Sequence, residues 1–91
     1  MHHFRGRLLE GDQVRLDPAN VYILFHHATA SGADPDWHGY LLIDPKSDLK
    51  SGYTYTLTLT DGRCGSLRID SLAPDEDGKF RAIFIGESPL V

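Results

Sequence analysis

Apolar and polar residues alternate with a period of two along much of the chain, which is the pattern of β-strands with one buried and one exposed face. The clearest case is segment 53–59, in which tyrosines and leucines alternate with threonines. The same alternation marks residues 4–8, 14–16 and 37–43. Each of these segments is predicted to be a strand.

Two further runs are apolar at consecutive positions. Segment 21–27 is rich in β-branched and aromatic residues, and segment 79–85 has Ile83 and Ile85 on the face opposite its phenylalanines. Such runs are typical of strands that are covered on both sides. We expect both strands to be covered in this way, or the last one to lie at the seam of a barrel.

Proline, glycine and aspartate divide these strands. The Asp-Pro dipeptides at 17–18 and 44–45 are predicted to end strands, because proline restricts the preceding residue and cannot donate to a sheet hydrogen bond. Residues 28–36 combine Gly, Pro and Asp and are predicted to form a loop. In the connection 44–52, Leu49 is expected to cover the open end of a core.

The alternation slips out of phase at the Asp-Gly pair of residues 61–62. A two-residue turn there would place Leu67 and Ile69 on the solvent face of the hairpin. An extra residue restores the phase and adds the bend that a small barrel needs. The places that can supply it are a loop of residues 60–62 with a left-handed glycine, a loop of residues 61–63, or a bulge at Gly65.

Six or seven short strands separated by turns predict an all-β fold, a small antiparallel β-barrel that spans residues 1–91 as a single domain. A compact sandwich is the alternative, and the barrel is preferred because closure protects the edges of so small a sheet. Glycines within or at the ends of strands are expected where the sheet turns a corner. They are Gly6, Gly39, Gly65 and Gly86.

Charge and cysteine content narrow the functional classes. Thirteen acidic residues against nine basic ones give a formal net charge of -4, which argues against general attraction to a phosphate backbone. Cys64 is the only cysteine, so an intrachain disulfide is excluded and a reducing, cytoplasmic location is expected. No segment approaches the roughly 20 apolar residues of a membrane-spanning helix, so no membrane association is expected.

His27, His38 and Asp36 form the candidate metal site. Strands joined by the 28–36 loop would bring positions 27 and 38 together, and imidazole and carboxylate ligands can hold zinc with an open position for water. His26 and His27 point to opposite faces of a strand, so only one of them can join His38. Because this ligand set is minimal, hydrogen-bonded or solvent-facing histidines are the other interpretation, and no cofactor is expected.

Trp37, Tyr40 and Arg63 are the candidate ligand-binding residues. Aromatic side chains at the mouth of a barrel can hold a small ligand, and arginines beside tyrosines can bind phosphate or a single nucleic-acid strand. The interior of so small a barrel is usually filled by its own side chains. The aromatic residues therefore have a second interpretation, as members of the core.

The C-terminal half carries a pattern that begins with Trp-x-Gly-x-Leu, continues through a Gly-Tyr start and alternating leucines to Asp-Gly-Arg-x-Gly, and ends with Phe-x-Gly and Pro-Leu. The matching positions are Trp37, Gly39, Leu41, Gly52, Tyr53, Tyr55, Leu57, Leu59, Asp61, Gly62, Arg63, Gly65, Phe84, Gly86, Pro89 and Leu90. In this pattern, which covers roughly residues 37–90, the chain resembles a group of small bacterial β-barrel proteins without an assigned function. The resemblance implies a small barrel and supplies no catalytic residue.

These observations together predict a non-enzymatic binding or protein-interaction module with a protein partner, such as an accessory subunit of a bacterial assembly. Two alternatives remain open at this point. One is a small metal-dependent enzyme that uses the histidine and aspartate site, and the other is a nucleic-acid-binding barrel, against which the excess of acidic residues weighs.

Overall fold

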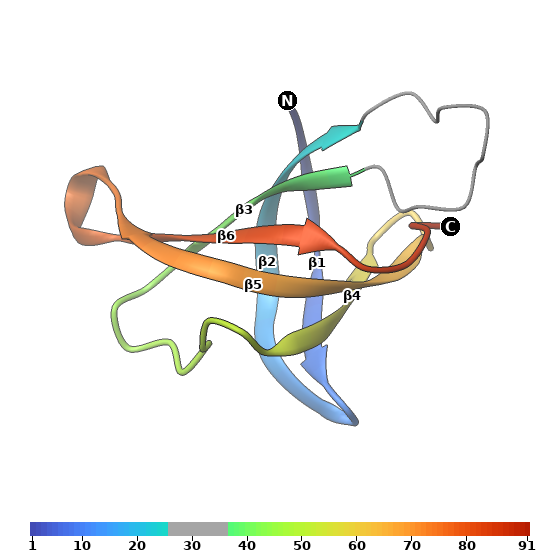
Figure 1. Cartoon of the computed structure of the whole chain (residues 1–91), viewed down its shortest axis with the longest axis horizontal. Coiled ribbons are helices and arrows are strands. Elements are labelled where there is room, and N and C mark those ends of the chain that lie inside the picture. Colours follow the sequence, from blue (N-terminus) through green and yellow to red (C-terminus); the bar gives the residue numbers. More distant parts are fainter. Residues whose placement is uncertain (26–36) are drawn as a thin grey trace.

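The computed structural model describes residues 1–25 and 37–91, apart from the side chain at position 77, and folds as a closed six-stranded antiparallel β-barrel (Figure 1). The strands are β1 (His2–Glu10), β2 (Gln13–Phe25), β3 (Trp37–Ile43), β4 (Thr54–Leu59), β5 (Cys64–Pro74) and β6 (Phe80–Gly86), with a short 3-10 turn, η1 (Glu76–Gly78), before β6. Their order around the barrel is β1-β2-β3-β6-β5-β4, and β4 pairs with β1 to close it. The predicted all-β antiparallel barrel is confirmed.

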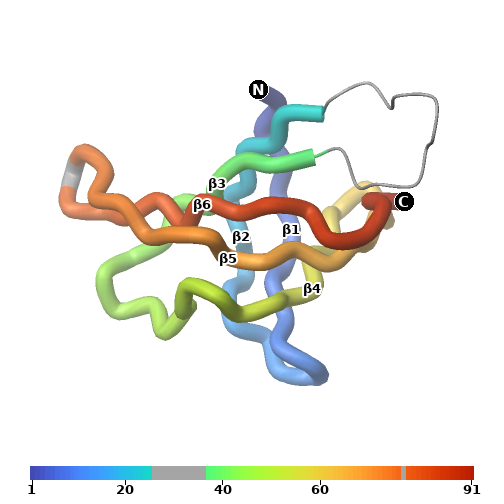
Figure 2. The backbone as a smooth tube through the Cα atoms, in the orientation of Figure 1, coloured from blue at the N-terminus to red at the C-terminus, as the bar shows by residue number. Residues whose placement is uncertain are grey.

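The strands cross one another in two directions. β3, β6 and β5 are hydrogen-bonded neighbours that run together across the molecule, while β1 and β2 pass behind them at a steep angle (Figures 1 and 2). The β5–β6 hairpin extends beyond the rest of the barrel at one end (Figure 1). No helix in the described ranges is long and apolar enough to cross a membrane.

The inward-facing side chains of all six strands form one core. Burial alternates along β3 and β4 as the sequence predicts, and each fully buried aliphatic side chain contributes about 1.5–3 kcal/mol. Leu67 and Ile69 are completely buried, as predicted, and Leu49 is 3% exposed and belongs to the same core. The largest completely buried side chains are Leu8, Val21, Ile23, Leu41, Leu57, Leu67, Ile69 and Phe84.

The β4–β5 hairpin shows how the phase of the sequence is restored. The Leu59 N–H donates to the Arg63 carbonyl at 2.8 Å, and the Gly62 N–H donates to the Leu59 carbonyl at 3.0 Å. These bonds define a loop of residues 60–62, in which Gly62 has a φ of 98°. The first of the three sequence alternatives is therefore confirmed, and the slip in the pattern is a feature of the turn.

β2 continues through the Asp17–Pro18 peptide bond, which is cis, so the prediction that this dipeptide ends a strand is wrong. The pairing of β1 with β2 shifts register here, since Gly6 pairs with Ala19 but Leu8 pairs with Leu16. At a register shift one residue of the strand is left without a partner, so its backbone N–H is not needed for a hydrogen bond between the strands. Proline is tolerated inside a long strand for that reason.

The expectation that the strand 21–27 is covered on both faces is wrong for its described residues, and so is the first of the two alternatives for the last strand, that it is covered. On the outer surface Leu24 is 37% exposed, Ile83 37% and Ile85 43%. The physical reason is size, because a chain this short fills the barrel interior and has no second layer among its described residues to cover the outside. The proposed end of the strand at 26–27 and the predicted loop 28–36 lie outside the described residues.

The predicted corner glycines face inward at places where another part of the chain comes very close. A Cβ added to Gly39 would collide with the carbonyl oxygen of Tyr22 on the neighbouring strand. A Cβ added to Gly86 would collide with the indole ring of Trp37. The glycines thus allow strands and rings to pack more closely than any side chain would permit.

Candidate functional site

The predicted metal site is only partly within the described structure. His27 and Asp36 lie outside the described residues. His38 is in β3, on the outer surface, where it pairs in register with Leu24 of β2 and Ile85 of β6. Within residues 1–25 and 37–91, no group of three or more His, Cys, Asp or Glu side chains could hold a metal ion. The metal site therefore stays a prediction.

Trp37 and Tyr40, two of the predicted ligand-binding residues, point to opposite faces of β3. Trp37 is 3% exposed and belongs to the core, where its Nε1–H donates to the Ser88 carbonyl at 2.7 Å and its ring meets Phe84 edge to face. Tyr40 lies on the outer surface, half-buried. Because alternate residues of a strand face opposite ways, one small ligand cannot contact both side chains from the same side.

Arg63, the third predicted ligand-binding residue, packs on the rings of Phe4 and Phe25 and pairs with Asp61. The central carbon of its guanidinium lies 4.8 Å from the ring centre of Phe4 and 5.6 Å from that of Phe25. Its Nε and Nη2 atoms lie 3.0 and 2.9 Å from Oδ2 of Asp61. These contacts give Arg63 a structural role, and the structure does not gather it with Tyr40.

The Arg63–Asp61 pair makes stability depend on pH. Hydrogen bonds from the Arg63 side chain and backbone N–H hold the pKa of Asp61 below its ordinary value, and they outweigh the opposing effect of desolvation. A carboxylate with a depressed folded-state pKa stabilises the fold above its unfolded pKa, and this contribution is lost as the pH falls through the folded-state value.

We expect Asp61→Asn to be less stable than the wild type near neutral pH, with the difference shrinking as the pH falls below the ordinary pKa of aspartate. Urea unfolding at a series of pH values measures it. Asp12→Asn in the β1–β2 turn controls for the loss of one carboxylate from a turn. An Asp61→Asn stability difference that stays constant with pH would contradict the assignment.

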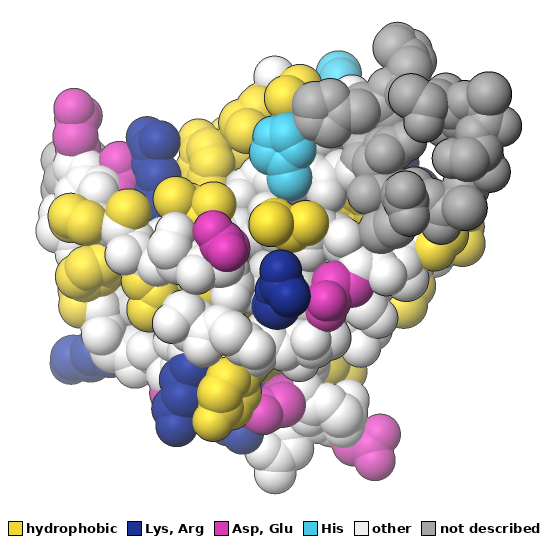
Figure 3. Space-filling view, in the orientation of Figure 1, with side chains coloured by type: hydrophobic (Ala, Val, Ile, Leu, Met, Phe, Trp, Pro, Cys, Tyr) yellow, Lys and Arg dark blue, Asp and Glu magenta, His cyan; other side chains and the backbone are white. Residues whose placement is uncertain are grey.

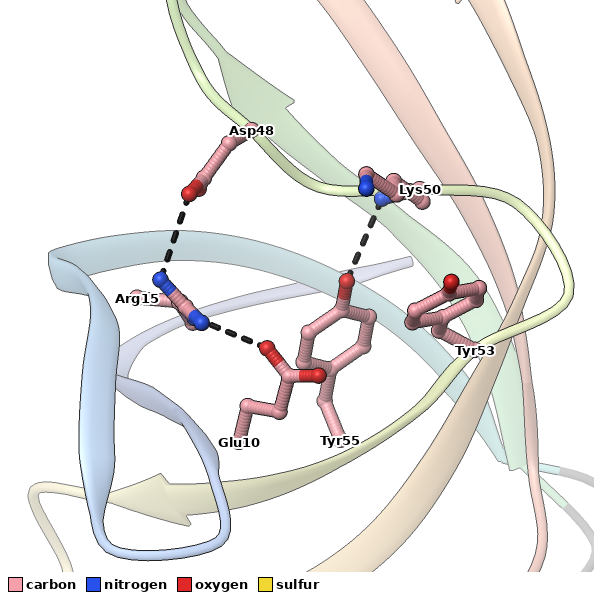
Figure 4. A pocket seen from close by; sticks show the side chains of 6 residues that line it. All are labelled: Glu10, Arg15, Asp48, Lys50, Tyr53 and Tyr55. Atoms are coloured by element: carbon pink, nitrogen blue, oxygen red, sulfur yellow. Dashed lines mark hydrogen bonds and ion pairs between the residues drawn. The ribbon is translucent and has the colours of Figure 1, made fainter.

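A polar hollow of about 170 Å³ lies at one end of the barrel, between the β1–β2 hairpin and the connection that leads to β4 (Figure 4). It is lined by Glu10, Arg15, Asp48, Lys50, Tyr53 and Tyr55. Arg15 donates to Glu10 at 2.8 Å and to Asp48 at 3.2 Å, and the Tyr55 hydroxyl accepts from the Lys50 backbone N–H at 3.2 Å. The charges neutralise one another and the volume is below the roughly 300 Å³ of typical ligand pockets. We therefore interpret these polar contacts as structural: through Arg15 they connect the β1–β2 hairpin to the loop that leads to β4.

The outer surface of β2, β3 and β6 carries a continuous set of apolar and aromatic side chains, here called the outer apolar face. Its members are Tyr22, Leu24, His38, Tyr40, Ile83 and Ile85. They form two adjacent rows, because Leu24, His38 and Ile85 are register neighbours and so are Tyr22, Tyr40 and Ile83. Figure 3 shows hydrophobic side chains and a histidine close together on this side of the molecule. Exposed apolar patches of this kind often mark interaction sites.

The two tyrosines of this face belong to a stacked row that crosses four strands. His3 stacks on Tyr22 with ring centres 4.8 Å apart, and Tyr22 stacks on Tyr40 at 4.9 Å with an interplanar angle of 17°. The Arg81 guanidinium carbon lies 4.6 Å from the Tyr40 ring centre. The strand order places His3 and Tyr40 on opposite sides of Tyr22, and Tyr22 and Arg81 on opposite sides of Tyr40. Both faces of each tyrosine ring are therefore occupied within the protein.

Charged side chains of both signs border the outer apolar face. Arg68 of β5 pairs in register with Ile85. Its Nη1 atom lies 3.9 Å from Oε2 of Glu87, and Nη2 of Arg81 lies 3.2 Å from Oδ1 of Asp75. Arg5 and Asp70 are at its outer margins, and both are exposed. Among the described residues, side chains of both signs therefore lie beside the face.

The sequence contained a signal for this face that pointed to a different conclusion. Segments 21–27 and 79–85 carry apolar residues at even- and odd-numbered positions alike, and this pattern predicts strands covered on both sides. Because the described residues supply no second layer over these positions, the same pattern here accompanies an exposed surface. The pairing of Tyr22 with Tyr40 depends on register, which one strand alone does not specify.

Comparisons with protein-family models, with curated proteins and with solved structures find no match to this chain. The resemblance of residues 37–90 to small bacterial barrels stays a prediction. What the geometry of residues 1–25 and 37–91 defines is a small closed β-barrel with exposed apolar side chains on the outer surface of β2, β3 and β6.

Proposed function

We propose that this chain is a non-enzymatic protein-interaction module that binds a protein partner through the outer apolar face, as an accessory subunit of a bacterial assembly. The observation that carries the proposal is the exposure of Leu24, Ile83 and Ile85 beside two half-buried tyrosines. Aliphatic and tyrosine side chains at the centre, with charged groups at the rim, are the usual composition of a protein–protein contact.

The same face supports a protein partner over nucleic acid. Proteins that bind single strands use aromatic rings whose faces are open to the bases. The ring faces of Tyr22 and Tyr40 are occupied by their neighbours, and only their edges and hydroxyls are available to another molecule. Among the described residues, Arg68 and Arg81 beside the face are each close to an acid, which weakens their attraction for phosphate.

Cys64 bears on where the protein works. It is a free, exposed thiol, which is consistent with the proposed cytoplasmic location because reducing compartments preserve thiols.

The competing hypothesis is a metal-dependent enzyme, which depends on His27 and Asp36 together with His38. Stoichiometric zinc in the purified chain, with a thermal shift on its removal, would favour that enzyme over the module.

Affinity purification from the native cell tests the function. The wild type, Ile83→Lys and Val14→Lys serve as baits; Val14 is also an exposed apolar strand residue but lies in the β1–β2 hairpin, away from the face. We expect a protein that the wild type and Val14→Lys retain and that Ile83→Lys retains at least tenfold less. That protein is then purified and titrated with the three chains. The same proteins on all three baits would contradict the proposal.

A further inference from the structure

We propose that the peptide unit between Asp61 and Gly62 is a latent isomerisation site, and that Arg63 protects it by holding the Asp61 side chain. The site lies in the turn between β4 and β5 and does not involve the interaction surface assigned above. An aspartate followed by glycine is especially open to this reaction, because glycine has no side chain to hinder attack by its backbone nitrogen.

The reaction is a rearrangement of the main chain. The Gly62 nitrogen attacks Cγ of a neutral Asp61 carboxyl group, so that an N–C bond forms and a C–O bond breaks, and the hydroxyl group leaves as water with the amide proton. A water molecule then opens the resulting succinimide ring. Cleavage between the nitrogen and Cγ restores aspartate, whereas cleavage between the nitrogen and the main-chain carbonyl carbon gives isoaspartate, in which the chain passes through Cγ.

Arg63 restrains the group that is attacked. Its Nε and Nη2 atoms lie 3.0 and 2.9 Å from Oδ2 of Asp61, and its backbone N–H donates to Oδ1 at 3.1 Å. Hydrogen bonds to both oxygens favour the charged carboxylate, whereas the neutral acid is the form that reacts. They also restrict rotation of the side chain, on which closure of the ring depends. Arg63 therefore disfavours both the protonation state and the movement that the reaction needs.

The protecting side chain is itself held in place from outside the turn. The guanidinium carbon of Arg63 lies 4.8 Å from the ring centre of Phe4 in β1 and 5.6 Å from that of Phe25 in β2. A cation over an aromatic ring is attracted by the negative face of the ring. An ion pair between two unrestrained exposed side chains contributes little. The rings reduce the freedom of the guanidinium and so favour its contact with Asp61.

The attacking nitrogen is restrained as well. The Gly62 N–H donates to the Leu59 carbonyl at 3.0 Å, in one of the bonds that define the turn. Because the attack removes the amide proton, ring closure sacrifices this hydrogen bond. The turn therefore has to open locally before the ring can form, and the reaction is slowed by the free energy of that opening.

Isomerisation alters the part of the chain that sets the phase of β5. An isoaspartate at position 61 adds one carbon atom to the main chain of the loop 60–62. This loop provides the extra residue that places Leu67 and Ile69 in the core, where both are completely buried. The isomerised chain is expected to be less stable than the original one, so protection of Asp61 preserves the barrel.

Ageing of the full 91-residue chain at mildly acidic pH tests the proposal. Wild type, Arg63→Ala, Arg63→Lys and Arg15→Ala are incubated where circular dichroism shows the barrel to be intact; Arg15 is an arginine that pairs with acids away from this turn. Peptide mapping by mass spectrometry with electron-transfer fragmentation measures isoaspartate at position 61 and in the second Asp-Gly pair, at 77–78. Each chain unfolded in guanidinium chloride gives the unprotected rate.

We expect isoaspartate at position 61 to form at least about tenfold more slowly in the folded wild type than in its unfolded chain. Arg63→Ala should lose most of this protection, and Arg63→Lys, which keeps the charge and the backbone donor, should lose part of it. Arg15→Ala should keep it. The rate at 77–78 should be the same in all four folded chains, because Arg63 acts on one turn only.

Three outcomes would overturn the proposal. Equal rates at position 61 in the folded and unfolded wild type would show that the turn gives no protection. A folded Arg63→Ala that stays as protected as the wild type would show that Arg63 is not the cause. Rates that rise together at positions 61 and 77 in this variant would indicate general unfolding.

A measurement on the wild type alone decides the case in which neither Arg63 variant folds. About 1 M salt screens the exposed Arg63–Asp61 pair. It should raise the rate of isomerisation at position 61 relative to the rate at 77–78. An unchanged ratio would contradict the protective role of Arg63.

Discussion

Replacing Gly39 with alanine is expected to lower the free energy of unfolding by about 3 kcal/mol, the upper part of the range for overpacked interiors. Gly39 faces the core at a point where the backbone of the neighbouring strand β2 comes very close. The new methyl group would collide with the Tyr22 carbonyl oxygen and lie 3.2 Å from the Cα atom of Ile23. Both are backbone atoms of a fully paired strand, so neither can rotate away as a side chain would.

Urea denaturation of Gly39→Ala is compared with that of Gly11→Ala. The comparison separates the cost in stability of a packing collision from the cost of an unfavourable backbone conformation. Gly11 has a φ of 60° and no atom within 4 Å of an added Cβ, so its replacement introduces only the left-handed penalty of about 1–2 kcal/mol. We expect the Gly39 variant to unfold at markedly lower urea, or to be recovered unfolded while the Gly11 variant folds. Equal midpoints for the two variants would show that β2 and β3 are not as close as described.

The strands that the sequence predicts best are those with one face in the barrel. In segment 53–59 strict alternation requires only that one side be buried, and this local signal sets the burial of Tyr55, Leu57 and Leu59. The β4–β5 turn was predictable for a related reason. Burial of Leu67 and Ile69 requires an extra residue near the Asp-Gly pair, although the pattern does not by itself choose residues 60–62.

The sequence predictions are wrong where the end of a strand or the exposure of a side chain depends on distant parts of the chain. Pro18 ends no strand because β1, a separate segment, shifts register opposite it. Ile83 and Ile85 are exposed because the whole chain, not the strand, determines whether a second layer exists. A local pattern contains neither piece of information.

The candidate site was harder to predict than the fold. Trp37 and Tyr40 are three residues apart, and the period of two alone places them on opposite faces of β3. That constraint was present in the sequence. The stacking of Tyr40 with Tyr22, by contrast, depends on the β2–β3 register, which the pattern within a single strand does not specify.

Trp37, a predicted ligand-binding residue, is better explained as the anchor of the C-terminal segment. Its indole packs on Gly86 and meets Phe84 at a ring distance of 5.6 Å. Its Nε1–H binds the Ser88 carbonyl, and the Ser88 hydroxyl in turn accepts from the Ser66 N–H at 2.8 Å. One side chain thus links β3, the end of β6 and the start of β5.

Trp37→Ala is therefore expected to lower the free energy of unfolding by about 3–5 kcal/mol, through a cavity in the core and the loss of the Ser88 hydrogen bond. Because Ser88 and the following residues lose their attachment, hydrogen exchange at the Cys64 and Val91 amides should accelerate more than global destabilisation accounts for. Tyr53→Ala removes an exposed aromatic ring and should cost less than about 1 kcal/mol. Equal effects of the two substitutions, or unchanged exchange at both amides, would contradict the anchoring role.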